Sequence, residues 1–363
     1  MQKGIALVEV LLAIAIGSLL LIGLTEIFVS NKATYNMQEG LSRLQENARF
    51  ALQTITKDFR MTNFLGCAQK NYNANNALLS TAYREVLKED DPAKLMWTYE
   101  TGIQGFEAAG GNFIPDRLDE ILVGDTPDEG SDIISLKIAR GNGYSLKQDM
   151  ADSDDDDNYA DNESLNVLTN NTTSLRAGDI AIITDCTTTT LFQVTGFSNA
   201  GDGEATIDHV KDQGDPPQND SDRLGYPFFQ GARVLPVETT SYFVRDGFLW
   251  RQIRRNGSTN MNSVKSDKLI DGVDSMQITY GLDSARSDER ADVYHTADTI
   301  DGLDAWRQVV SVRIGLLLRT NDEVMPGKDT KVYRVNGQDI DLADDRRFRR
   351  IFTNTIALRN RTP

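Results

Sequence analysis

An apolar stretch near the N-terminus limits what this chain can fold into. Residues 5–29 are almost all apolar, and four clearly polar side chains interrupt them: Glu9, Ser18, Thr25 and Glu26. A membrane-spanning helix needs roughly 20 apolar residues, so the stretch is long enough to cross a bilayer. A carboxylate within such a span is costly and marks a candidate functional residue. We therefore predict a membrane-spanning helix over residues 5–31, with Glu9 as its first candidate site.

The charges around this span predict its orientation and exclude one class of partner. Lys3 precedes the span, so the positive-inside rule places Lys3 in the cytoplasm and everything after about Asn31 outside it. The formal net charge of the 363-residue chain is −16, whereas nucleic-acid binding needs a basic face. We therefore expect no general nucleic-acid partner.

The residues after the span continue a helical pattern but change character. Apolar side chains recur there at spacings of four and three: Met37, Leu41, Leu44, Ala48, Ala51, Ile55 and Phe59. No proline interrupts residues 5–63, so we predict one continuous helix. Its amphipathic half, residues 32–66, is expected to close at Gly66. We expect the stripe to pack on the chain's own sheet; an exposed coiled-coil seam is the alternative.

The short segment before the apolar core carries a processing signal. No small-residue cleavage site of the ordinary secretory kind follows the core. Instead, Lys3 and Gly4 precede the core, Ile5 begins it, and Glu9 is the fifth residue after Gly4. This arrangement resembles the class III prepilin signal of type IV pilins and type II secretion pseudopilins. The chain departs from that family at Ile5, where phenylalanine is usual.

The resemblance implies a role for each of these residues. Prepilin peptidase would cleave after Gly4 and remove residues 1–4 as a leader, and the new N-terminus at Ile5 would be N-methylated. Glu9 would pair with the N-terminal amine of a neighbouring subunit and set the register between subunits, because a buried charge is tolerable only when paired. A plain membrane anchor, with Glu9 in the headgroup region, is the alternative.

Residues 67–363 alternate between short β-type segments and turns. Such a pattern predicts an antiparallel head domain of sandwich or open-barrel type, and we expect residues 71–130 to be loops with short pieces of structure. The fold class predicted is α+β: a long N-terminal α-helix, transmembrane and then amphipathic, packed on an antiparallel β-rich globular domain. Strands are predicted at residues 132–140, 179–184, 191–197, 205–209, 232–237, 240–244, 248–253, 270–280, 309–318, 332–335 and 351–357.

Glycines within and between these segments predict local irregularities. Asp246 and Gly247 separate two predicted strands and form a compact hairpin signal. Gly196, Gly272 and Gly315 fall inside predicted strands, where we expect them to mark β-bulges.

The chain has two cysteines, Cys67 and Cys186. If the bulk of the chain lies outside the inner membrane, its compartment is oxidising and the two thiols should form a disulfide. The alternative is a zinc site made by these cysteines with His209 and His295, but their spacings match no compact metal motif. We therefore predict the disulfide.

Residues 151–164 form an acidic tract. Four of its carboxylates fall at the first, third, fifth and twelfth positions of an EF-hand loop: Asp152, Asp154, Asp156 and Glu163. However, Asp157 stands where that loop needs glycine, and no helical pattern flanks the tract. We therefore expect a solvated acidic surface loop in preference to a calcium site.

A basic cluster near the C-terminus has two interpretations. It consists of Arg346, Arg347, Phe348, Arg349 and Arg350. The first interpretation is DNA capture; the second, favoured by the acidic chain, is a set of strand-edge or subunit-contact arginines. With two histidines in the chain and no spacing that singles out a pair of acids, we expect no enzyme activity and no cofactor.

Motifs in the distal half resemble the C-terminal region of PilW-type minor pilins. They lie at residues 272–274, 277–281, 306–313 and 358–361, and the contexts of Cys67 and of Asp185-Cys186 also look like that type. The resemblance implies a minor pilin that joins other minor pilins and the major pilin in an inner-membrane complex. Such a complex primes pilus assembly for twitching motility and cell adhesion, and the subunit ends near the fibre tip, where a tip adhesin is a further candidate partner.

Two other functions stay open at this point. One is a minor pseudopilin of a type II secretion system, since pseudopilins share the N-terminal signal. The other is a pilus-tip binding module for calcium or DNA, carried by the acidic tract or the basic cluster. In each case the protein would be a single-pass inner-membrane protein with a cytoplasmic N-terminus and a periplasmic head, before any transfer to the fibre.

Overall fold

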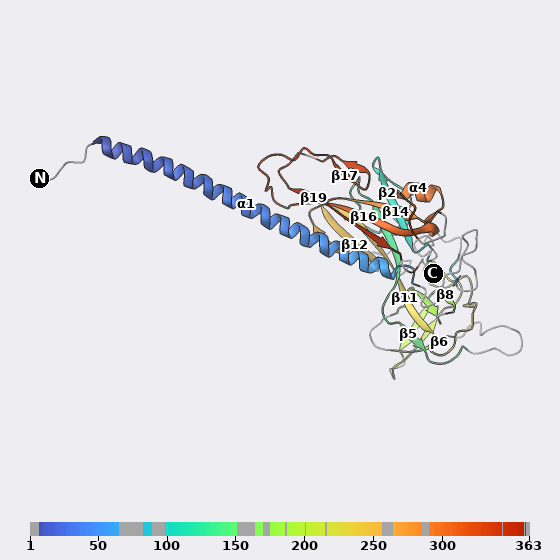
Figure 1. Ribbon diagram of the computed structural model, residues 1–363. Coiled ribbons are helices and arrows are strands. Elements are labelled where there is room, and N and C mark those ends of the chain that lie inside the picture. Colours follow the sequence, from blue (N-terminus) through green and yellow to red (C-terminus); the bar gives the residue numbers. More distant parts are fainter. Residues whose placement is uncertain are drawn as a thin grey trace, which may run out of the picture.

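The structure is a computed structural model of the whole chain. It describes residues 7–64, 83–88, 99, 101–150, 164–169, 175–185, 187–199, 201–214, 216–255, 264–284, 290–342, 344–358 and 360. A long helix projects from a β-rich head, and the N-terminus lies at its far end (Figure 1). The predicted α+β fold class is confirmed.

The N-terminal helix α1 spans Leu7–Met61 without interruption, a length of about 80 Å at 1.5 Å per residue. The predicted closing residue, Gly66, was wrong, because the helix ends at Met61. Asn63 adopts the left-handed conformation, with φ of 57°, and its N–H donates to the carbonyl oxygen of Lys137 at 3.0 Å. Asparagine tolerates this conformation better than most residues, so it can stop a helix as glycine does.

The head contains two main sheets, both visible in Figure 1. The larger has 13 strands: β1 (Tyr83–Glu85), β2 (Ile103–Ala109), β3 (Asn112–Ile114), β4 (Ile133–Ala139), β5 (Tyr144–Leu146), β6 (Leu165–Leu168), β7 (Ile180–Thr184), β8 (Thr189–Gln193), β9 (Gly196–Asn199), β10 (Glu204–Asp208), β11 (Arg233–Arg245), β12 (Phe248–Arg254) and β13 (Val264–Asp271). The smaller has the order β15 (Val293–His295), β14 (Val273–Leu282), β16 (Val309–Arg319) and β19 (Arg349–Ala357). Within the described part of the chain, all strand pairs are antiparallel except β1 with β8.

Smaller elements complete the head. The hairpin of β17 (Tyr333–Val335) and β18 (Gln338–Ile340) forms a third, two-stranded sheet. Among the described connections, two contain short helices, α3 (Leu118–Ile121) and α4 (Ala297–Gly302), and one contains a 3-10 turn at Trp306–Gln308. The seven-residue strand β2 lies within the region predicted to be mainly loop, so that prediction understated the structure there.

Strand β11 connects two halves of the larger sheet. Along one edge it pairs with β5 and then β4; along the other it pairs with β7 and then β12. The prediction of two strands at residues 232–237 and 240–244 was wrong, because Glu238 and Thr239 are buried and continue the strand. The hairpin at Asp246 and Gly247 is confirmed: both have positive φ, and Arg245 pairs with Phe248 across a two-residue turn.

The apolar stripe of α1 forms part of the main core. Five of its residues are buried with residues of β4, β14 and β16: Leu44, Ala48, Ala51, Ile55 and Phe59. The helix contacts β4 and β13 of the larger sheet and β16 and β19 of the smaller. Packing of the stripe on the chain's own sheets is therefore confirmed, although Met37, its first residue, remains 38% exposed.

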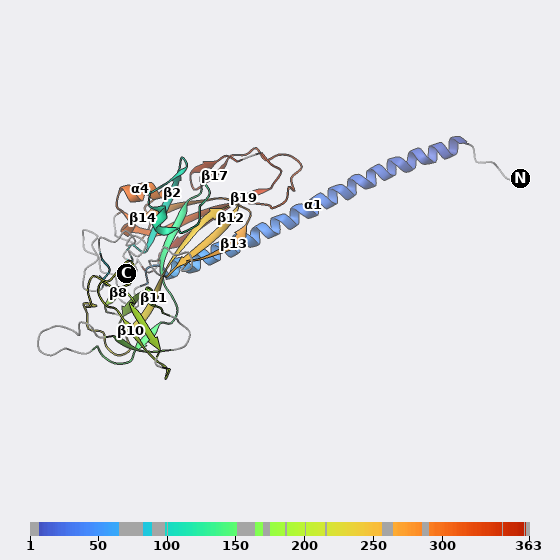
Figure 2. The same cartoon turned by 180° about the vertical axis from the view of Figure 1, so that it is seen from behind.

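A second core lies in the other half of the larger sheet. The segment between β4 and β11 forms strands β5–β10, which enclose a separate cluster that includes Tyr144, Val167, Ile183, Phe192 and Phe228. Figure 2 shows these strands below the half that carries α1. The head therefore has a helix-bound half and a distal half, with β11 passing through both.

The predicted bulges were wrong, for a different reason at each glycine. The predicted strand at 270–280 is two strands in different sheets, and Gly272, with φ of 71°, is the residue between β13 and β14. Gly315 of β16 pairs with both β14 and β19 without a shift in register. The glycine is needed there for space, because a Cβ would come within 2.6 Å of Val335. Gly196 starts β9, whose register with β10 is also unshifted, and the strand predicted at 191–197 begins two residues earlier, as β8.

Candidate functional site

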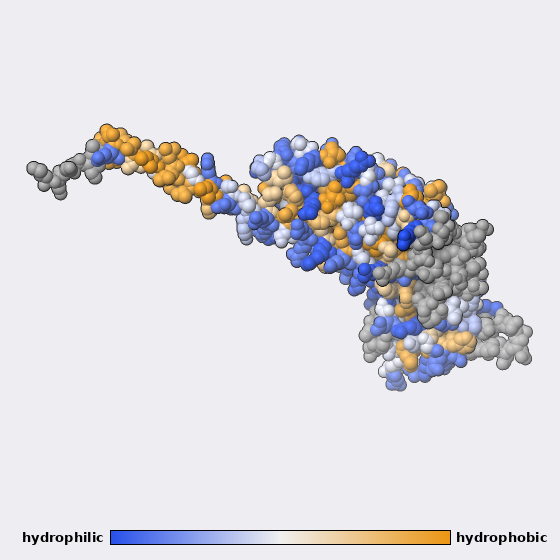
Figure 3. Space-filling view, viewed as in Figure 1, coloured by the Kyte–Doolittle hydropathy of each residue, from blue (hydrophilic) through white to orange (hydrophobic). Residues whose placement is uncertain are grey.

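The first half of α1 is an exposed apolar surface. Every residue from Leu7 to Glu39 is exposed except Gly17 and Gly23, which are half-buried. This part of the helix is long and apolar enough to cross a membrane, and none of its most apolar window is buried in the head. Figure 3 shows the apolar surface continuing along the projecting helix until it becomes polar near the head. An apolar surface of this size is compatible with a membrane anchor.

Two hydroxyl side chains within the apolar residues 7–29 bond to the helix backbone. Ser18 Oγ donates to the carbonyl oxygen of Ala15 at 2.9 Å, and Thr25 Oγ1 donates to that of Ile22 at 3.0 Å. A hydroxyl satisfied within its own helix needs no outside partner, so these residues do not oppose burial in a bilayer.

Glu9 lies in the first turn of the described helix, and its side chain is exposed. The positive end of the helix dipole is at this terminus and favours a carboxylate there. Gly4 and Ile5, the predicted processing residues, lie outside the described residues. The structure therefore places Glu9 near the end of the described helix that lies away from the head.

The other end of α1 is fixed in the head by a buried ionic network. Asp58 is buried and accepts from Arg140 Nη2 at 2.8 Å and from the Tyr242 hydroxyl at 2.7 Å. Arg140 also pairs with Glu238 at 3.1 Å, and Glu238 with Arg255 at 2.7 Å. Burial, reinforced by the charge of Asp58, raises the pKa of Tyr242, so its hydroxyl remains a donor. The network holds the helix to β11 and to the start of the distal half.

Sequence reasoning missed this network, although one signal was present. Asp58 follows Ala51 by seven residues and Ile55 by three, so it falls on the apolar stripe itself. A carboxylate on a buried helix face needs a cation from elsewhere in the fold.

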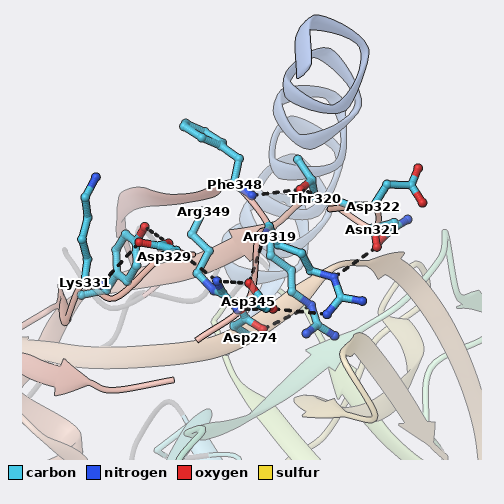
Figure 4. Close-up of polar contacts among 12 residues, drawn as sticks. Asp274, Arg319, Thr320, Asn321, Asp322, Asp329, Lys331, Asp345, Phe348 and Arg349 are labelled. Carbon is cyan, nitrogen blue, oxygen red and sulfur yellow. Dashed lines mark hydrogen bonds and ion pairs between the residues drawn. The ribbon is translucent and has the colours of Figure 1, made fainter. Parts of the chain in front are cut away.

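The basic cluster at 346–350 is mostly engaged within the chain. Arg349 is 6% exposed and contacts three carboxylates: Asp345 at 2.6 Å, Asp274 at 2.8 Å and Asp329 at 3.6 Å. The hydrogen bond from Arg349 lowers the pKa of Asp345 to about 2. Figure 4 shows Arg349 directed into this group of carboxylates.

The neighbouring arginines are engaged to different degrees. Arg346 donates to the carbonyl oxygen of Met325, and Arg347 pairs with Asp345. The guanidinium of Arg350 lies 5.5 Å from the ring of Phe352. This arrangement matches the strand-edge interpretation for Arg347 and Arg349, whereas Arg346 and Arg350 are exposed and form no ion pair with the described residues.

Two buried carboxyl groups were also missed. Asp132 accepts from the N–H groups of Ala108 and Ile278, and Glu107 accepts from Gln338 and from the N–H of Ala297. Burial raises the pKa of Asp132 to about 8 and that of Glu107 to about 7, and the repulsion between the two groups adds to the rise for Asp132. Because Asp132 precedes β4 and Ile278 lies in β14, the first of these groups joins the two sheets.

The remaining predicted site residues are only partly described. Cys67, Cys186 and residues 151–163 of the acidic tract lie outside the described residues. His209 follows β10 in the distal half, with its ring 5.8 Å from that of Phe192, and His295 ends β15 in the smaller sheet. Among the residues that the structure describes, no group of three or more His, Cys, Asp or Glu side chains is placed to hold a metal ion.

The comparisons with known proteins point to one process. A family model described as Type IV Pilus-assembly protein W matches residues 241–360. The match covers the end of β11, strands β12 and β13 and the whole smaller sheet, which include most of the strands that contact α1. It relates the chain to type IV pilus assembly. Comparison with curated proteins and comparison with solved structures found no match.

Proposed function

We propose that the protein is a minor pilin that joins other pilins in the inner membrane, primes type IV pilus assembly and ends near the fibre tip. The observation that carries the proposal is the division of α1, which is one continuous helix with an exposed apolar first half and a second half whose apolar stripe is buried in the head. The match of residues 241–360 to the pilus-assembly model supports this proposal.

The proposed assembly depends on lateral packing of the apolar half of α1. In the membrane this half is surrounded by lipid, and in a fibre it is surrounded by the helices of other subunits. Since both surroundings are apolar, packing alone discriminates weakly between alternative registers. A carboxylate at Glu9 paired with the N-terminal amine of a neighbour supplies that discrimination, because an unpaired charge in hydrocarbon is costly.

The proposed location follows from the same helix. The apolar half would span the inner membrane once, with Lys3 in the cytoplasm and the head in the periplasm. Prepilin peptidase would process the chain between Gly4 and Ile5 before the subunit leaves the bilayer. Other minor pilins and the major pilin are the proposed partners, and a tip adhesin is a further one.

Glu9→Ala tests this function. We expect the variant to be processed normally but to enter sheared fibres at a level lower by on the order of tenfold, because the register pair is lost. Glu26→Ala is the matched control, since Glu26 is an exposed acid on the same helix, and it should enter fibres normally. Incorporation of Glu9→Ala at the normal level would contradict the pairing.

Deleting the gene for this protein distinguishes a minor pilin from a minor pseudopilin of a type II secretion system. Loss of twitching motility with intact type II secretion is the expected result. Loss of secretion with intact motility would instead favour a minor pseudopilin.

We also propose that Cys67 and Cys186 form the predicted disulfide. Met61 and Phe64, at the end of α1, line the same pocket as Thr184, Asp185 and Thr187. Phe64 also packs in the cluster that contains Ile182 and Leu191 of β7 and β8. The segment that leads to one cysteine therefore lies against the strands that flank the other, which supports a bridge between them.

A further inference from the structure

Strand β19 forms one edge of the smaller sheet and pairs only with β16 among the strands described. Two hydrogen bonds, one at each end of the strand, show which residues of β19 bond to β16. The N–H of Leu358 donates to the carbonyl oxygen of Val310 at 2.8 Å, and the N–H of Thr320 donates to that of Phe348 at 2.9 Å. Since the register is continuous, the even-numbered residues of β19 exchange hydrogen bonds with β16. The N–H and C=O groups of the odd-numbered residues point away from the sheet: Ile351, Thr353, Thr355 and Ala357.

This edge lacks the usual protection against pairing. Thr353, Thr355 and Ala357 are exposed, and no other described part of the chain bonds to the outward N–H groups. Natural edges are usually blocked by proline, lysine, a bulge or a covering element. Residues 351–357 contain neither proline nor lysine, and their register has no bulge. The edge can therefore template another strand.

A groove lies beside the edge, between β19 and α1. Its volume is about 710 Å³, and its lining residues are Arg49, Leu52, Gln53, Thr56, Lys57, Arg60, Met61 and Asn354. Asn354 donates to Thr56 Oγ1 at 3.0 Å and joins the two walls. Leu52 and Met61 are half-buried and give the groove an apolar part. Alternate side chains of a strand added at β19 would enter this groove.

The charge of the groove favours an acidic occupant. Arg49, Lys57 and Arg60 are exposed, and none forms an ion pair with the described part of the chain. Three cations thus line one groove of a chain with a net charge of −16. Pairing of β19 with β19 of a second copy is disfavoured, because the strand carries the exposed Arg350 and contains no acid, so two copies would bring cations together. The occupant should therefore come from a different polypeptide.

We propose that the open edge of β19 and the cationic groove beside it dock an acidic β-strand from another polypeptide. Hydrogen bonds from the partner's backbone to the odd-numbered residues of β19 supply affinity, and the groove supplies specificity. Apolar side chains of the partner contact Leu52 and Met61, and its carboxylates contact Arg49, Lys57 and Arg60. The proposal concerns this surface and does not depend on the pilus role.

The test uses the full chain in detergent micelles and two labelled peptides, each about nine residues long. One has threonine at odd positions and alternating valine and glutamate at even positions; in the other, lysine replaces glutamate. Fluorescence anisotropy should show binding of the glutamate peptide, weakened by salt, and no binding of the lysine peptide. Equal binding of both peptides, or binding of neither, would overturn the proposal.

Two variants locate the binding. Thr353→Pro removes an outward N–H without breaking a hydrogen bond to β16, so it should weaken binding of the glutamate peptide about tenfold. Thr353→Val is the matched control: it keeps the N–H and should bind the glutamate peptide normally. Lys57→Glu removes a cation from the α1 side of the groove and should also weaken binding of this peptide. This variant tests the proposal if Thr353→Pro does not fold.

Two further outcomes would overturn the proposal. One is unchanged peptide binding by folded Thr353→Pro or by Lys57→Glu. The other is sedimentation showing that Thr353→Pro dissociates a dimer of the chain, which would assign the edge to a second copy.

Discussion

Arg349 is a cation whose partners all come from its own chain. It joins β19 to Asp274 of β14 and to the loop residues Asp329 and Asp345, so one side chain holds together segments far apart in sequence. Asp58 does the same for α1, β11 and the residue after β4. Buried charges of this kind fix the geometry of a head whose formal net charge is strongly negative, since each requires one arrangement of partners.

Arg349→Met should destabilise the head. It removes the one cation that contacts all three carboxylates and leaves only the weaker pairs of Arg319 with Asp274 and of Arg347 with Asp345, and breaking a buried pair costs about 3–5 kcal/mol. Urea unfolding of the full chain in micelles, followed by circular dichroism, measures the change. Arg350→Met is the matched control: it alters the next, exposed residue and should shift the free energy of unfolding by less than about 0.5 kcal/mol. Similar losses in the two variants would show that the carboxylate contacts contribute little.

Glu107→Gln should change how stability depends on pH. The folded pKa values of Glu107 and Asp132 lie above their ordinary values, so the folded chain binds more protons than the unfolded chain between about pH 4 and 8. The free energy of unfolding should therefore fall as the pH rises through this window. The nearby acid Asp298 raises the cost of charging the pair, and the charges of the pair in turn help to raise the pKa of the buried Tyr280 hydroxyl.

Removing one acid of this pair isolates the effect. Glu107→Gln should reduce the loss of stability between pH 5 and pH 8 by about 1 kcal/mol or more, because one raised pKa disappears and Asp132 loses a repulsive neighbour. Unfolding titrations at the two pH values measure the difference. Identical pH dependence in the variant and the original chain would contradict the assignment.

Among the elements, the junction of β13 and β14 decides how the two sheets are connected. Gly272 takes the chain from the larger sheet to the smaller, and its carbonyl accepts from Arg319 N–H at 2.8 Å. A Cβ on Gly272 would lie 2.5 Å from the carbonyl oxygen of Arg319, and φ is 71°. Only glycine combines this conformation with so close an approach of the neighbouring backbone.

Gly272→Ala should therefore destabilise the head by roughly 1–3 kcal/mol, from backbone strain and the contact with Arg319. Gly302→Ala provides the comparison, because Gly302 has open space around it and no positive φ. That substitution should be neutral or slightly stabilising, by up to about 1 kcal/mol. Thermal unfolding of the two variants measures both effects, and a neutral Gly272→Ala would show that the junction relaxes.

For the whole molecule, local patterns predicted the fold class but not the path of the chain. Periodicity and the absence of proline predicted α1, because a helix depends on neighbours within a few residues. The continuity of β11 through Glu238 and Thr239 depends on β4, β7 and β12, which pair with it from elsewhere in the chain. The sheet change at Gly272 likewise depends on Arg319, which the local sequence does not reveal.

The candidate functional residues also divide into those that the local sequence reveals and those that only the fold reveals. Glu9 was recognisable because its apolar surroundings are contiguous in sequence. The networks of Arg349 and Asp132 could not be recognised from the sequence, since their partners come from distant segments that only the fold brings together. The open edge of β19 belongs with these, because it depends on the order of strands in a sheet.

The proposed disulfide yields the prediction for the whole molecule, since it would tie the end of α1 to the distal half. Thiol assay of the non-reduced, denatured full chain should find no free thiol, and Cys67→Ser should expose one. Reduction should lower the free energy of unfolding by about 2–4 kcal/mol, because the bridge closes a long loop in the unfolded chain. Two reactive thiols in protein from an oxidising compartment would rule the bridge out. In that case Asp58 and its partners would be the main tie between the helix and the distal half.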